Sequence, residues 1–71
     1  MNYIILETQT SQDGTVGTLV YSFTDENQAE SKYHEVLQYA AISKAAKHAA
    51  FFLTDDGIYV KSERYYHDKD D

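Results

Sequence analysis

One stretch decides the fold of this chain: TDENQAESKYHEVLQYAA, residues 24–41. Asp25 can accept hydrogen bonds from the free backbone N–H groups of a first helical turn, and Gln28, three residues later, can complete a capping box. Apolar residues then recur at helical spacing on one face; they are Ala29, Tyr33, Val36, Leu37 and Ala40. The stretch predicts an amphipathic helix that starts at Asp25. Neither glycine nor proline marks its C-terminus, which we expect between Ser43 and Lys47.

A hairpin signal precedes this helix. Residues 3–9 are rich in isoleucine, leucine and tyrosine, and residues 15–23 alternate between the two faces of a strand. Asp13-Gly14, which lies between them, is a strong signal for a hairpin turn. Gly17 predicts a bulge in the second strand.

A second hairpin signal follows the helix. Residues 49–54 form an apolar run, Asp55-Asp56-Gly57 marks a turn, and residues 58–66 alternate as a fourth strand. With a right-handed crossover, the third strand lies beside the first. The sequence therefore predicts an α+β fold, a four-stranded antiparallel sheet in the order 2-1-3-4 with one helix packed on one face. We expect residues 1–67 to form a single domain and residues 68–71 a frayed tail.

The composition excludes several classes of protein. Twelve acidic residues against six basic ones give a net charge of −6, so the chain lacks the basic face that direct nucleic-acid binding needs. It has no cysteine, which excludes disulfides and thiolate metal sites. No apolar run approaches the roughly 20 residues that span a bilayer. We expect a cytoplasmic protein without a membrane or nucleic-acid partner, whose acidic surface keeps it soluble or meets a basic protein.

His34 and Glu35 start the zinc-protease pattern, in which a second histidine stands four residues after the first. That position is Gln38, so the pattern is broken at a metal ligand. All three residues lie off the apolar stripe of the helix. They are therefore expected on its solvent-exposed side.

The other histidines give no clear site. His48 is expected at the connection between helix and third strand, and His67 stands next to Asp68. The serines have no glycine-flanked elbow, and the three glycines are isolated rather than grouped in a phosphate-binding loop. The sequence predicts no catalytic residue, no metal site and no cofactor, and hence not an enzyme.

Seven tyrosines are the unusual feature of the composition. Aromatic residues are enriched at protein interfaces, and a sheet with one helix has a face without cover. We expect the helix to cover the strand positions Ile4, Leu6, Ile58 and Val60. Alternation and helical spacing then give a predicted interface of Tyr3, Ile5, Tyr39, Ile42, Tyr59 and Tyr65. Soluble monomers seldom expose large apolar patches, so we expect a homo-oligomer, most simply a dimer.

Four short segments carry a resemblance: residues 29–34, 40–41, 48–50 and 55–57. In these segments, which are spread over most of the chain, the sequence resembles a group of small bacteriophage and bacterial proteins of unassigned function. The resemblance implies a short acidic protein that acts by binding and has no catalytic residues. Some such proteins inhibit host defence systems by occupying a protein surface, and others sequester a nucleotide signal in an oligomeric pocket.

Three functions are compatible with these features. The first is a non-enzymatic, self-associating binding module, a phage-type inhibitor that occupies the surface of a basic host protein and is anchored by tyrosines. The alternative is a protein that sequesters a small molecule such as a nucleotide signal, with a pocket between subunits lined by tyrosines, lysines, His34, His48 or Arg64. The third is an accessory subunit of a larger enzyme.

Overall fold

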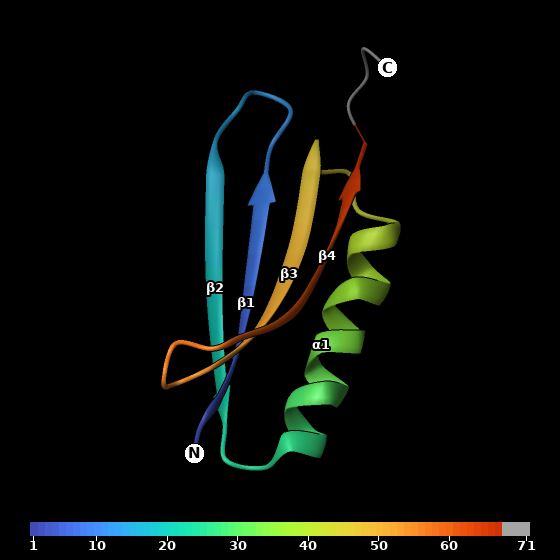
Figure 1. The fold of residues 1–71 in the computed structure, drawn as a ribbon. Helices are drawn as coiled ribbons and strands as arrows, with labels where there is room; N and C mark the ends of the chain where they lie inside the picture. The colour runs from blue at the N-terminus through green and yellow to red at the C-terminus, as the bar shows by residue number, and fades with distance from the viewer. Residues whose placement is uncertain (68–71) are drawn as a thin grey trace.

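The computed structural model describes residues 1–67 and contains one sheet and one helix (Figure 1). The elements are β1 (Tyr3–Thr10), β2 (Val16–Phe23), α1 (Glu26–Ala41), β3 (Lys47–Thr54) and β4 (Tyr59–Tyr66). All neighbouring strands are antiparallel, in the order β2-β1-β3-β4, and α1 packs on one face. This confirms the predicted α+β fold. The predicted frayed tail, residues 68–71, lies outside the described residues.

Both hairpins turn where the sequence predicts. In the first, the Ser11 N–H donates to the Thr15 carbonyl at 2.8 Å, and Gly14 has a φ of +93° that an L-residue rarely adopts. The Thr15 N–H also donates to the Asp13 carboxylate at 3.0 Å, which lowers the pKa of that carboxyl. Gly57 takes the corresponding position in the second hairpin, with a φ of +89°.

The helix begins as expected and ends sooner. Asp25 caps α1 by accepting from the Asn27 N–H at 2.8 Å. The helix ends at Ala41, before the predicted range, because the N–H groups of Ile42 and Ser43 reach carbonyls only three residues back. Ser43 Oγ then accepts from the Ala45 N–H, and β3 follows.

The core lies between α1 and the two central strands. Its buried members are Ile5, Ala29, Tyr33, Val36, Ala50 and Phe52. The Tyr33 and Phe52 rings meet edge to face, with centroids 6.0 Å apart. Burial raises the pKa of Tyr33. The predicted apolar stripe of the helix therefore does face the sheet, with Leu37 packed at its margin.

The predicted faces of β1 are wrong. Ile5 is fully buried under α1, and Tyr3 packs beside it, whereas Ile4 and Leu6 point to the other side of the sheet. Because β1 begins with four successive apolar residues, either side of this strand could pack against the helix. The choice is settled by Glu7, which is buried on the helix side because it has a partner in β3.

Two further positions differ from the sequence-based expectation. Ile58 and Val60, expected beneath the helix, are both exposed. Gly17 makes no bulge, since it pairs with Gln9 in an unbroken register between β1 and β2. The irregularity in the sheet instead lies between Phe52 and Leu53, opposite β4.

Candidate binding surface

One face of the sheet has no cover within the described part of the chain. We call this side, opposite α1, the open face. Strand pairing assigns sixteen positions to it. They are Ile4, Leu6, Thr8 and Thr10 in β1, Val16, Thr18, Val20 and Ser22 in β2, Lys47, Ala49, Phe51 and Leu53 in β3, and Tyr59, Ser62, Arg64 and Tyr66 in β4.

The charge on the open face differs from that of the chain. Among the described residues, no aspartate or glutamate lies on this face. Its only charged positions there are Lys47 and Arg64, at the same end of the sheet. In a chain of net charge −6, one broad surface is thus uncharged over most of its area and basic at one end.

Large apolar side chains are exposed on the open face. Val20 is 63 % exposed and Tyr59 is 58 % exposed, and Val16 and Tyr66 are comparably open. The Tyr59 hydroxyl lies 2.9 Å from Ser62 Oγ, which holds the ring along the sheet. Contiguous apolar surface of this kind is typical of an interaction site.

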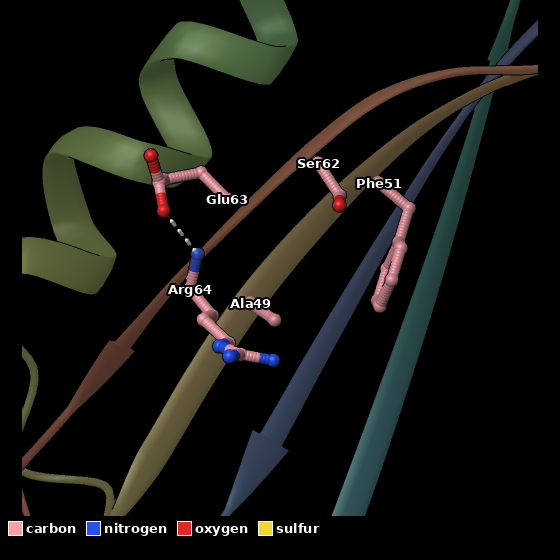
Figure 2. Close-up of a pocket in the computed structure, with 5 residues that line it drawn as sticks. All are labelled: Ala49, Phe51, Ser62, Glu63 and Arg64. Carbon is pink, nitrogen blue, oxygen red and sulfur yellow. Dashed lines mark hydrogen bonds between the residues drawn. The ribbon is translucent and has the colours of Figure 1, made fainter.

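A shallow hollow of about 320 Å³ lies over β3 and β4. Figure 2 shows its lining, in which Phe51, Ser62 and Arg64 lie on one side of the strands while Glu63 points toward α1. The Arg64 guanidinium lies 5.3 Å from the centre of the Tyr66 ring, within the range of a cation–π contact. An arginine and a hydroxyl beside an aromatic ring are groups that can hold a small anion with an aromatic part.

The structure separates the six residues of the predicted interface. Tyr59 alone lies on the open face. Tyr39 and Ile42 are 60 % and 79 % exposed on or just after the helix, away from the sheet. Tyr3 and Ile5 belong to the core, and Tyr65, opposite His48, lies on the helix side, where its ring stacks on His67.

The residues that sequence reasoning missed are mainly aliphatic. Val16, Val20, Phe51 and Leu53 make up much of the apolar part of the open face. In the sequence, these residues occupy alternate positions of their strands, and no acidic residue occurs at the alternate positions they share. This pattern identifies one face of the sheet only when the strand register is known.

A polar cluster is buried on the other side of the sheet. Glu7 Oε2 lies 2.6 Å from His48 Nε2, and the same carboxylate accepts from the Tyr21 hydroxyl at 3.3 Å and from the Gln9 amide at 3.1 Å. His48 is 3 % exposed, and its Nδ1 has no hydrogen-bond partner. His48 therefore lies inside β3 rather than at the predicted connection, and it ties β3 to β1.

The other histidines are apart from this cluster. His34 is exposed on α1 together with Glu35 and Gln38, as predicted for the solvent side of the helix. The His67 ring contacts the Ala40 carbonyl at 2.9 Å, near the C-terminus of α1. Within residues 1–67, no three His, Cys, Asp or Glu side chains converge in a way that could hold a metal ion. Asp68, which follows His67 in the sequence, lies outside the described residues.

Comparisons with protein-family models, curated proteins and solved structures found no match. No helix among residues 1–67 is long and apolar enough to cross a membrane. The fold and the surface together define the chain as a small α+β module with one helix-covered and one open sheet face.

Proposed function

We propose that the protein is a non-catalytic cytoplasmic binding module that works as a symmetric homo-oligomer, in which the open face of one copy packs on the open face of a second. The observation that carries this proposal is the absence of carboxylates from that face in the described residues, in a chain with twelve acidic residues. Copies of net charge −6 repel each other, and this is a broad surface on which they can meet without opposed carboxylates.

The dimensions of the sheet suit such a contact. Four strands of eight residues form a face of roughly 500 Å² in projection. The accessible area of a face with projecting side chains is larger than its projected area. Stable interfaces bury about 800 Å² per partner. Two sheets packed face to face in this way have their inner side chains interdigitated, as in a β-sandwich. The two-fold dimer is the commonest arrangement for such a self-complementary surface.

The outside of this oligomer carries the acidic groups. Exposed carboxylates lie on α1 and in the hairpin turns, and they include Asp13, Glu26, Glu35, Asp55 and Asp56. An acidic exterior steers association toward a basic protein. The resemblance to small phage proteins supports a host protein as this partner, which the module would inhibit by occupying its surface.

Placing a carboxylate on the open face should dissociate the oligomer. We expect Tyr59→Asp to weaken self-association at least tenfold, because two-fold symmetry brings two new charges into one apolar contact. Sedimentation velocity over a range of protein concentrations measures the effect. Tyr39→Asp on α1 is the matched control, since Tyr39 and Tyr59 are equally exposed. A monomeric wild type at high micromolar concentration, or dissociation by the control variant alone, would overturn the proposal.

The hollow in Figure 2 favours a second function, the sequestering of a small anionic molecule such as a nucleotide signal. Arg64 and Ser62 line it on the face that a second copy would cover, so dimerisation would turn the hollow into a pocket between subunits. Of the residues that the sequence suggested for such a pocket, only Arg64 lies there. His34 is on the exposed side of α1, and His48 is buried beneath it.

This second function has its own test. If it is correct, at least one nucleoside phosphate in a panel should raise the Tm. At a ligand concentration of one hundred times its Kd, the free energy of unfolding should rise by about 2.7 kcal/mol. Arg64→Gln should abolish the shift, and Lys44→Gln, an exposed cation outside the hollow, should keep it. Absence of a shift for every nucleotide, with no small molecule retained in native mass spectrometry, would rule this function out.

A further inference from the structure

The two edges of the sheet are protected very differently. The β4 edge has a register irregularity opposite Phe52 and Leu53 and carries Lys61, Glu63 and Arg64. The β2 edge has the sequence VGTLVYSF, with no charged residue and no proline, and it pairs with β1 in one unbroken register of eight residues. Natural sheets usually protect their edges with charges, prolines or bulges, because free edges recruit further strands. β2 has none of these.

The turn between β1 and β2 determines which backbone N–H and C=O groups of β2 have no partner in β1. The Ser11 N–H bonds the Thr15 carbonyl, so hydrogen-bonded pairs between β1 and β2 fall on odd-numbered residues of β2. The N–H and C=O groups of the even-numbered residues therefore point away from β1, to the edge. These residues are Val16, Thr18, Val20 and Ser22, and all of them are exposed.

No feature of the described chain requires a glycine at position 17. Its φ is not positive, it makes no bulge, and a Cβ added to it would meet nothing within 4 Å. Glycine in a strand loses about 0.5–1 kcal/mol relative to alanine. A glycine of this kind often marks a place where another chain approaches closely. A hollow of about 340 Å³ adjoins it, lined among others by Glu7, Gln9 and Leu19.

We infer that β2 pairs antiparallel with β2 of a second copy about a two-fold axis at Leu19. This register places even-numbered residues opposite each other, Thr18 against Val20 and Val16 against Ser22, so the outward N–H and C=O groups bond across the edge. Leu19, half exposed in the single chain, then meets its own copy in the close, non-hydrogen-bonded kind of pair.

The same register gives Gly17 a partner. It lies directly opposite Tyr21 of the second copy, where an aromatic ring can cover the bare glycine backbone. A two-fold axis one residue further on would place Phe23 there instead. The adjoining hollow is lined by the polar side chains of Glu7, Gln9 and Thr15, which suit the hydroxyl of tyrosine better than a phenyl ring. The axis at Leu19 is therefore preferred.

This edge contact deepens the proposed function, on which it rests for the view that the chain works as a symmetric oligomer. The two sheets become one sheet of eight strands, with both open faces on the same side. Its two-fold axis is perpendicular to the sheet, whereas that of the face-to-face contact is parallel to it. Where these two axes intersect, both contacts together close into a four-copy assembly with D2 symmetry.

Amide hydrogen exchange by NMR tests the edge contact position by position. The N–H groups of Thr18 and Val20 should become protected as the protein concentration rises, while those of Leu19 and Tyr21 are protected at every concentration by their bonds to β1. A face-to-face dimer leaves the even-numbered amides of β2 free. Fast exchange at Thr18 and Val20 in a sample that sedimentation shows to be oligomeric would overturn the inference.

Gly17→Val gives a second measurement on the same contact. The side chain meets open space in the single chain, so the thermal stability of the monomer should not fall. It would occupy the place of the Tyr21 ring of the second copy, and concentration-dependent protection of Thr18 and Val20 should weaken about tenfold. Gln38→Ala, an exposed substitution on α1 outside both proposed contacts, is the control and should change neither quantity. If Gly17→Val associates like the wild type, the proposed pairing of β2 with β2 about an axis at Leu19 is wrong. If Tyr59→Asp loses association and Gly17→Val does not, the protein associates through the face-to-face contact and not through the edge contact.

Discussion

Replacing Ile5 by lysine should unfold the protein. Ile5 is fully buried between Phe52 and the helix residues Tyr33 and Val36. An ammonium group placed there loses its water, and the buried carboxylate on the same side of β1, Glu7, is already bonded to His48 and Tyr21, so burying the new charge costs several kcal/mol. A domain of this length has a total stability of roughly 4–10 kcal/mol. Far-UV circular dichroism and a urea titration should therefore show no cooperative native state.

Ile4→Lys is the matched control for this result. Ile4 is the preceding residue, of the same type, and it lies on the open face, where a lysine stem can cover apolar surface while its charge reaches water. We expect this variant to fold with a cooperative urea transition. A folded Ile5→Lys beside an unfolded Ile4→Lys would mean that the helix covers the opposite face of β1.

The elements of this fold were predictable because their signals are local. Asp25 caps the helix through the backbone of its own first turn, and Gly14 and Gly57 take the positive φ angles that the two turns require. Helical spacing also placed Tyr33 and Val36 in the core correctly. Each of these inferences uses residues close together in the chain, so no knowledge of the tertiary structure is needed.

The faces of β1 were not predictable in this way. The run Tyr3–Leu6 is apolar at four successive positions, so alternation gives no preference between its two sides. The side is fixed by Glu7, which can be buried only because His48, 41 residues later, lies within 2.6 Å. A carboxylate in a strand normally indicates the solvent side. The pairing that reverses this rule is a long-range contact.

The open face illustrates the same limit. Tyrosine count suggested an interface, but Tyr3, Tyr21 and Tyr33 pack in or against the core, and only Tyr59 of the predicted set lies on the open face. The more informative property is the absence of carboxylates at one parity in each strand. It requires the registers of all three strand pairs to be known together, and the irregularity opposite Phe52 and Leu53 shifts one of them.

Removing the Glu7 carboxylate should be the most costly polar substitution in the described chain. In Glu7→Leu, the buried His48 ring loses its partner at Nε2 while Nδ1 already has none, and the Tyr21 hydroxyl and Gln9 amide lose an acceptor. Breaking one side of such a buried pair costs about 3–5 kcal/mol. Urea denaturation should show a loss of about 3 kcal/mol, far beyond that of an ordinary surface substitution.

The double variant Glu7→Leu/His48→Leu separates the pair from its members. With both polar groups gone, no buried donor or acceptor of the pair is left without a partner, so the double variant should be more stable than Glu7→Leu alone. A double-mutant cycle should give a coupling energy above about 1.5 kcal/mol between the two positions. Strictly additive losses would mean that the 2.6 Å contact between Glu7 Oε2 and His48 Nε2 does not hold β1 to β3. Glu35→Leu, exposed on α1, is the control for the loss of a carboxylate as such and should change stability by less than about 0.5 kcal/mol.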